Sequence, residues 1–169
     1  MPAIITCRAL GPVELLVNGE TAPPDLLWRK HLALIVYLAR SPKLVRTHDH
    51  LVGLLWAEAS DEKAGKSLNQ AIHLVRRYAG ETSINTDAGQ VRLAAGVVDL
   101  DTDRFDSFTK VHQWDAAAEL VGGHFLEGFG IDGASEFETW LGVERARWRE
   151  RSVAALVQAG EGRGVGIRG

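Results

Sequence analysis

The chain has 169 residues, of which 46% are hydrophobic, and a formal net charge of −3. This length allows one large domain or two small ones, each with a buried core. The longest apolar run, residues 32–38, is too short to span a bilayer. The chain starts on an alternating strand pattern without the basic leader of a signal peptide, and its one cysteine, Cys7, suits a reducing compartment. We therefore expect a cytoplasmic protein with no membrane contact.

The charge is divided unevenly along the chain. Residues 1–98 hold 11 Lys and Arg against 9 Asp and Glu, a net charge of +2, whereas residues 99–169 hold 8 against 13, a net charge of −5. This asymmetry is typical of a weakly basic unit joined to an acidic one. It predicts two domains, at 1–98 and 99–159, followed by a glycine-rich tail at 160–169 that we expect to be disordered.

The first elements are short strands. Residues 4–10 and 13–17 are rich in β-favouring side chains, and Asn18-Gly19 follows them directly. This dipeptide favours a tight hairpin turn because both residues tolerate positive φ, so residues 20–22 form a third short strand. The chain therefore opens with a small antiparallel sheet.

Three helices come next. The apolar spacing over residues 26–39 predicts the first, which Ser41-Pro42 ends. Thr47 is a good N-cap for a short second helix that runs to about residue 57. Ser60 caps a third helix at 62–79, which Gly80 ends.

After Gly80 the apolar residues again alternate with polar ones, which is the two-residue period of a β-strand. Residues 83–86 and 90–93 flank Asp87-Ala88-Gly89 as a hairpin, and residues 97–100 form a further edge strand. The remainder is helical, with short helices at 103–111 and 114–121, a loop at 125–133, and a long helix from Ser135 to about residue 158. Ser135 and Glu138 have the spacing of a capping box. The predicted fold is an α+β winged helix-turn-helix with an N-terminal antiparallel sheet, followed by an all-α helical segment.

The third helix indicates the function. Its inward stripe consists of apolar residues three and four apart, namely Ala64, Leu68, Ala71, Ile72, Val75 and Ala79. The opposite stripe has the side chains that read DNA, namely Lys66, Asn69, Gln70, His73, Arg76 and Arg77. A solvated helix face usually includes Asp and Glu, and residues 64–79 contain neither.

A basic face on an isolated helix is more often simply solvated than functional. Here a capped helix precedes it and a hairpin follows, which is the order of a DNA-binding winged helix. Arg92 in the hairpin and Arg29-Lys30 at the first helix are suited to phosphate contacts. Thr47 starts the second helix, whose N-terminal dipole attracts phosphate. We therefore expect double-stranded DNA as a partner.

The sequence resembles the SARP-type antibiotic regulatory activators, which join an OmpR-like winged helix to a bacterial transcriptional activation domain (BTAD). The resemblance covers roughly residues 7–160. The motifs that carry it are Leu10-Gly11-Pro12, Leu54-Leu55-Trp56, Leu68, Arg76-Arg77, Gly80, Gly89, Arg92, Val98-Asp99-Leu100-Asp101, Arg104-Phe105, residues 125–129, Glu136-Phe137, Trp140-Leu141 and Glu144-Arg145. The chain departs from the family at Gly65 and Leu74, where basic residues are common, and at Val91, where the wing has an aromatic residue.

The resemblance implies a bacterial transcription activator that binds promoter direct repeats as a homodimer. It also implies that the helical segment is tetratricopeptide-like and contacts RNA polymerase or a second subunit. Repeat units of this kind bury their faces on neighbouring helices, and residues 135–158 have no following helix to pair with. We therefore expect the chain to be a truncated form of a longer regulator.

Other functions have weaker support. His48 and His50 point in different directions on a helix and no further ligand completes a tetrahedral metal site. No strand precedes the glycines of the tail, which argues against a dinucleotide-binding loop. Ser67 and Ser107 have no adjacent base, which argues against a catalytic serine. We expect no cofactor and no enzymatic activity. The alternative is a non-enzymatic protein-interaction module, a winged helix that does not bind DNA.

Overall fold

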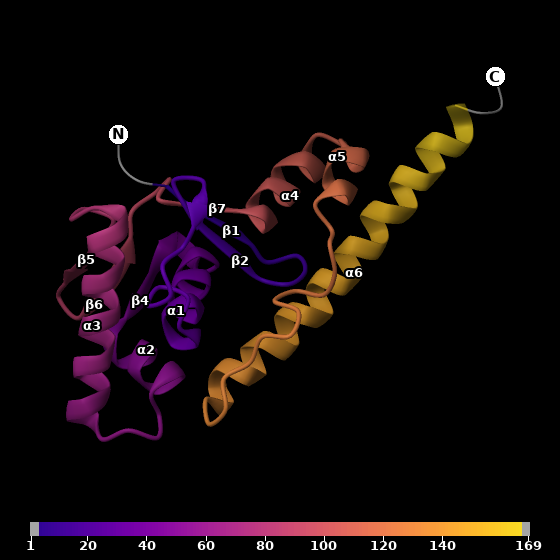
Figure 1. Ribbon diagram of the computed structural model, residues 1–169. Helices are drawn as coiled ribbons and strands as arrows, with labels where there is room; N and C mark the ends of the chain where they lie inside the picture. Colours follow the sequence, from indigo (N-terminus) through magenta and orange to yellow (C-terminus); the bar gives the residue numbers. More distant parts are fainter. Residues whose placement is uncertain (1–3, 167–169) are drawn as a thin grey trace. The chain divides into compact units, whose positions relative to one another are not determined.

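The computed structural model describes residues 4–166, with side chains described as far as residue 162 (Figure 1). The chain forms two compact units. Among the described residues, the first unit contains residues 4–7, Leu15–Asp99 and Gly130–Trp140. The second unit contains Arg8–Glu14, Leu100–Phe129 and residues 141–166.

The N-terminal sheet has the strand order β3-β2-β1-β7. Its strands are β1 (Ile5–Arg8), β2 (Glu14–Val17), β3 (Glu20–Thr21) and β7 (Val98–Leu100). Strands β2 and β3 pair antiparallel, with Val17 opposite Glu20. The turn between them has Asn18 at φ 51° and Gly19 at φ 84°. The hairpin predicted from this dipeptide is confirmed, and β7 is an edge strand as expected.

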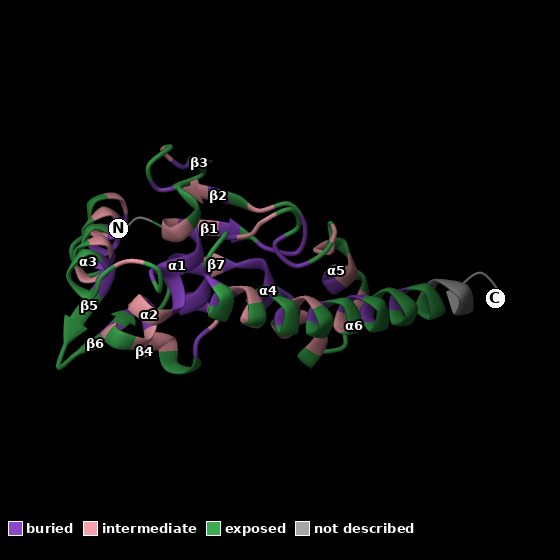
Figure 2. Ribbon diagram, turned by 90° about the horizontal axis from the view of Figure 1, so that it is seen from below, coloured by how far each residue is buried: buried purple, intermediate pink, exposed green. Residues whose placement is uncertain are grey.

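The helices of the first unit are α1 (Arg29–Ala39), α2 (His48–Leu55) and α3 (Asp61–Ala79), with a short 3-10 turn at Pro42–Leu44. Residues 32–39 of α1 are all buried (Figure 2). The prediction that this helix begins at residue 26 is wrong by three residues. The N–H groups of Leu26 and Leu27 donate to the Pro23 carbonyl in a separate turn, and Trp28 has the extended ψ of 137° before the helix starts.

A second sheet has the order β4-β6-β5, formed by β4 (Val45–Thr47), β6 (Gln90–Leu93) and β5 (Ile84–Asp87). The hairpin of β5 and β6 matches the prediction, with its turn at Ala88-Gly89. Strand β4 was not predicted. It exists because β6 supplies its partners, with Val45 opposite Arg92 and Thr47 opposite Gln90.

The second unit contains α4 (Asp101–Lys110), α5 (Trp114–Glu119) and the part of α6 (Ser135–Gly166) from Leu141 onward. Phe105 and Trp148 are both buried and meet edge to face, with ring centroids 5.4 Å apart. The Arg145 guanidinium donates to the carbonyl oxygens of Phe125, Leu126 and Phe129 at 3.0, 2.8 and 2.7 Å. These bonds hold the loop before α6 against that helix.

Helix α6 begins at Ser135 as predicted and extends beyond the predicted end at about residue 158. The Glu138 carboxylate, predicted to take part in a capping box, accepts the Ile131 N–H at 2.6 Å. The tail predicted to be disordered at 160–169 is helical as far as Gly166, and residues 167–169 lie outside the described residues. Once a helix is nucleated, each added residue gains one backbone hydrogen bond, which offsets the low helix propensity of glycine.

The two units also divide the chain differently from the predicted ranges 1–98 and 99–159. Residues 8–14 belong with the helical unit because the buried Asp101 carboxylate accepts the N–H groups of Ala9 and Leu10, both at 2.9 Å. Residues 130–140 belong with the first unit, where Trp140 meets the Tyr37 ring edge to face at 5.0 Å.

Burial raises the pKa of Asp101, and its backbone hydrogen bonds oppose that rise because they favour the ionised carboxylate. Within residues 4–166, no helix is long and apolar enough to cross a membrane.

Replacing Asp101 with alanine leaves two backbone N–H groups without their acceptor. An unsatisfied buried donor costs about 1–3 kcal/mol, so Asp101→Ala should lower the free energy of unfolding by at least that amount. Urea denaturation followed by circular dichroism measures this. Asp132→Ala, at an exposed carboxylate, is the control and should change stability by less than about 0.5 kcal/mol. Equal stability of the two variants would contradict the assigned role of Asp101.

Candidate nucleic-acid interface

Helix α3 has one buried and one exposed side. The six predicted inward residues, Ala64, Leu68, Ala71, Ile72, Val75 and Ala79, are each at most 2% exposed. On the opposite side five of the six predicted DNA-reading residues are exposed, namely Lys66, Asn69, Gln70, His73 and Arg77. The sixth, Arg76, is partly buried. The periodicity therefore placed both sides of this helix correctly.

The start of α3 is capped as predicted. The backbone N–H of Lys63 donates to Ser60 Oγ at 3.4 Å. One turn later, Lys66 Nζ lies 3.3 Å from Glu62 Oε1, with both side chains strongly exposed. An ion pair this exposed is weakly held, so Lys66 is available to exchange Glu62 for another anion.

His48 connects three parts of the candidate surface. Its backbone N–H donates to the Gly89 carbonyl in the β5–β6 turn at 2.8 Å, and its Nε2 lies 3.4 Å from Asn69 Oδ1 on α3. The preceding residue, Thr47, caps α2, because its Oγ1 accepts the His50 N–H at 3.1 Å. The turn of the hairpin, the start of α2 and the middle of α3 are thereby placed together. Sequence reasoning did not assign His48 this part, because its signal is a tertiary contact.

Arg76 and Arg77 have different surroundings. Arg76 Nε donates to the Ile84 carbonyl at 2.8 Å, which ties α3 to strand β5. Arg77 is exposed, with its guanidinium 5.7 Å from the centre of the Tyr78 ring. Of these two neighbours, Arg77 has the side chain that is accessible to a ligand, and Arg76 positions the hairpin.

The hairpin presents polar side chains on one face. Arg92 lies opposite Asn85 in the β5–β6 register, and both are exposed. Arg92 Nη1 donates to the Lys43 carbonyl at 3.5 Å, a long hydrogen bond. On the other face Val91 and Leu93 are buried. The alternation that predicted the strand also directs Arg92 outward.

The two cations at the start of α1, Arg29 and Lys30, contact residues of the first unit that lie outside α3. Arg29 Nη1 donates to the Gly130 carbonyl at 2.7 Å. Lys30 Nζ lies about 6 Å from the ring centres of Trp28 and Trp56. Both residues are thus occupied by intramolecular contacts that do not include the residues of α3.

Behind the surface, α1 supports α2 through one polar contact. Tyr37 OH lies 2.7 Å from His50 Nε2. Burial raises the pKa of Tyr37, so the phenol keeps its proton, and the tautomer of His50 sets which of the two groups donates. Arg46, which sequence reasoning also left out, lies over the Tyr37 ring at 5.1 Å and donates from Nε to Ser41 Oγ at 2.9 Å. Within the described part of the chain, no group of three His, Cys, Asp or Glu side chains is arranged to hold a metal ion.

Comparison with known proteins gives a likeness in fold. No family model matches the chain, and no curated protein matches it. A solved structure of Mycobacterium tuberculosis EmbR in complex with a low-affinity phosphopeptide matches it with a TM-score of 0.69 and 18% sequence identity, over 91% of this chain. The chain spans 43% of the EmbR chain. The likeness shows a shared mixed α/β fold with an N-terminal sheet and C-terminal helices.

The different surroundings of Arg76 and Arg77 predict different effects on stability. Arg76→Ala removes the bond to the Ile84 carbonyl and should lower the free energy of unfolding by about 0.5–1.5 kcal/mol. Arg77→Ala removes an exposed side chain and should change it by less than about 0.5 kcal/mol. Thermal unfolding of the two variants measures both values. A loss at Arg77 as large as the loss at Arg76 would contradict this assignment.

Gly65 allows a second test of the helix. A Cβ at this position would meet His48 Cε1 at 3.9 Å, an ordinary van der Waals contact. Gly65→Ala should therefore raise the free energy of unfolding by roughly 0.5–1 kcal/mol, the difference in helix propensity. Gly89, with φ +75°, is the contrast, since alanine there is strained and should lower stability by about 1–2 kcal/mol. A destabilising Gly65→Ala would show that the first turn of α3 is not a regular helix.

Proposed function

We propose that this chain is a sequence-specific, DNA-binding transcription regulator of the SARP type, with an OmpR-like winged helix and a BTAD-like helical part. One observation carries the proposal: residues 64–79 of α3 expose an acid-free polar face beside a hairpin that is bonded to the start of α2. In this assignment α3 reads the major groove, and residues 83–93 contact the minor groove and phosphates.

The exposed side chains of α3 match the chemistry of base recognition. Gln70 and Asn69 each offer an amide that pairs bidentately with adenine, and Arg77 donates to guanine O6 and N7. His73 adds a donor on the same side of the helix. Arg76 is the exception, because it is half-buried and its 2.8 Å bond to the Ile84 carbonyl uses part of the guanidinium. The 3.4 Å contact of Asn69 with His48 is long by comparison, and Asn69 is exposed and His48 partly so. We therefore assign Arg76 to placing the hairpin and the other five to the DNA.

Phosphate contacts in this proposal come from the hairpin and from the start of α2. Arg92 is exposed on β6, and Thr47 caps α2, whose N-terminal N–H groups attract anions. The +2 charge of residues 1–98 is small for a DNA-binding domain, so we expect modest affinity that falls steeply with salt. Arg29 and Lys30 have lower priority as phosphate contacts, because each is engaged within the chain.

The partners are proposed on the same basis. The fold shared with EmbR supports a regulator of this type, although the phosphopeptide is a ligand of EmbR and the chain spans less than half of that protein. We propose that the helical part contacts RNA polymerase or a second subunit, and that promoter direct repeats are bound by two copies. The activity requires no cofactor.

The test is selection of bound DNA from a random pool, followed by mobility-shift titration of the selected site and of random DNA. Arg77→Ala and Gln70→Ala should each weaken binding to the selected site by roughly 1–3 kcal/mol, with little effect on random DNA. Arg92→Ala should weaken both by a similar amount, because a phosphate contact does not read sequence.

Asp132→Ala, at an exposed position of the first unit away from α3 and the hairpin in sequence, is the matched control and should bind as wild type. Two results would contradict the proposal: unchanged binding of both Arg77→Ala and Gln70→Ala, or no retention on DNA at low salt. Salt-insensitive association with a protein instead would favour the interaction module.

A further inference from the structure

Strand β4 and the start of α2 border a concavity in the first unit. Its volume is about 340 Å³, and it is lined by Val45, Arg46, Thr47, His50 and Gln90. Thr47 lies opposite Gln90 where β4 pairs with β6, so the wall of this space includes the base of the hairpin. The next residue, His48, contacts Asn69 of α3. The concavity therefore adjoins the candidate interface.

Arg46 is the cation of this concavity. Its Nε donates to Ser41 Oγ at 2.9 Å, and its guanidinium lies 5.1 Å from the centre of the Tyr37 ring. Neither contact is with a carboxylate, and Nη1 and Nη2 make no hydrogen bond to any residue from 4 to 162. An arginine held in place with two nitrogens unused is suited to a phosphate group, which accepts parallel N–H bonds from it.

His50 adds a group whose charge depends on pH. Its Nε2 lies 2.7 Å from Tyr37 OH, and its Nδ1 makes no hydrogen bond among the described residues. A phenol both donates and accepts, so the Tyr37 contact persists whether the imidazole is neutral or protonated. Burial raises the pKa of Tyr37, so the phenol does not titrate in this range. Protonation of His50 therefore adds a second positive charge to the concavity without breaking a hydrogen bond.

Charges of both signs surround the Tyr37–His50 pair. Arg46 of β4 lowers the pKa of Tyr37 and Glu136 of α6 raises it, both less than burial does, so both charges act on the pair. Arg46 disfavours a protonated His50, whereas Glu136 favours it, as does Asp49, the preceding residue on α2. Gln90 of β6 is uncharged. A phosphate in the concavity would shift this balance toward the protonated imidazole.

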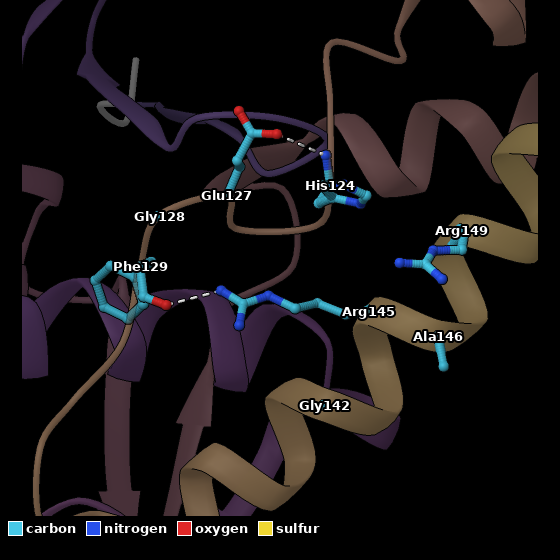
Figure 3. A pocket seen from close by; sticks show the side chains of 8 residues that line it. All are labelled: His124, Glu127, Gly128, Phe129, Gly142, Arg145, Ala146 and Arg149. Carbon is cyan, nitrogen blue, oxygen red and sulfur yellow. Dashed lines mark hydrogen bonds between the residues drawn. The ribbon is translucent and has the colours of Figure 1, made fainter.

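A larger concavity in the second unit has a different set of charges. It has a volume of about 570 Å³ and lies between α6 and the loop at residues 124–129 (Figure 3). The guanidinium of Arg145 is turned to the Phe129 carbonyl there, and Glu127 is part of the wall. The five residues that line the smaller concavity include no carboxylate. The smaller concavity is therefore the one suited to an anion.

We propose that the concavity at β4 and α2 binds one phosphate group of the DNA backbone between Arg46 and the protonated imidazole of His50, so that DNA binding takes up a proton. This inference rests on the proposed DNA binding and adds its dependence on pH. Because the phosphate stabilises the protonated imidazole, affinity for DNA rises as pH falls through the range in which histidines titrate, from about pH 8 to about pH 5. The effect is the same on selected and random DNA, since a phosphate contact does not read sequence.

The first experiment is mobility-shift titration of the full chain at about pH 6 and about pH 8, at constant ionic strength. Wild type should bind about three- to tenfold more tightly at the lower pH, since stabilising the proton by one pH unit corresponds to a factor of ten. His50→Gln keeps a hydrogen-bonding partner for Tyr37 without the charge and should lose most of this pH dependence. Arg46→Gln should weaken binding at both pH values.

His124→Gln, at an exposed histidine of the second unit, is the matched control and should keep the wild-type pH dependence. Circular dichroism shows whether each variant keeps its helix content.

The second experiment needs no DNA. Imidazole NMR signals of the full chain are followed against pH with millimolar inorganic phosphate, and with chloride at the same ionic strength as the reference. The signal missing from His50→Gln identifies His50. Phosphate should move the titration midpoint of that signal to higher pH in wild type, and much less in Arg46→Gln. The His124 signal should not move.

Two mobility-shift results overturn the proposal: equal affinity of wild type at both pH values, or a pH dependence that His50→Gln keeps in full. A chain that binds no DNA at either pH contradicts the proposed function instead, and the phosphate titration then decides this site by itself. An unmoved His50 signal overturns the site, whereas a moved signal supports a phosphate site whose ligand is not DNA.

Discussion

Burial of one side of α3 is the constraint from which the candidate interface follows. Its six inward residues are each at most 2% exposed, and every buried methylene contributes about 0.8 kcal/mol. Turning the helix to bury Arg77 or Gln70 instead would desolvate polar groups without partners. The core therefore fixes the direction of the polar face, and the polar residues themselves are free to vary. A surface of this kind is suited to recognition, because its chemistry can change without changing the fold.

The sequence predicted the elements whose signals are local. Asn18-Gly19 specifies its own turn through φ, Thr47 and Ser60 cap helices that begin beside them, and the stripes of α3 follow from spacing alone. Strand β4 lacks such a signal, because its three residues become a strand only through pairing with β6, some 45 positions away. The contact of residues 8–14 with the helical unit also lacks a local signal, since the bonds of Asp101 reach back to Ala9 and Leu10.

The candidate site shows the same division between local and tertiary information. Arg76 and Arg77 are adjacent and chemically identical, and spacing puts both on the polar side of α3. Only the position of the Ile84 carbonyl separates the arginine that holds the hairpin from the one that is exposed. Arg29 likewise finds its acceptor at Gly130, 101 positions along the chain. Periodicity can therefore list which side chains face outward, but tertiary contacts decide which of them are free to bind.

The small positive charge of the first part of the chain limits the proposed DNA binding. Residues 1–98 carry a net charge of +2, so one copy holds DNA modestly and loses affinity as the salt concentration rises. On direct repeats a contact between two neighbouring copies adds to the free energy of binding, because the second copy then binds at the effective concentration set by the first. Linkage makes this effect reciprocal, so DNA strengthens a contact between copies by the factor by which that contact strengthens DNA binding. Weak individual contacts then have a regulatory advantage, since occupancy responds to protein concentration and salt more steeply than that of a tight monomer.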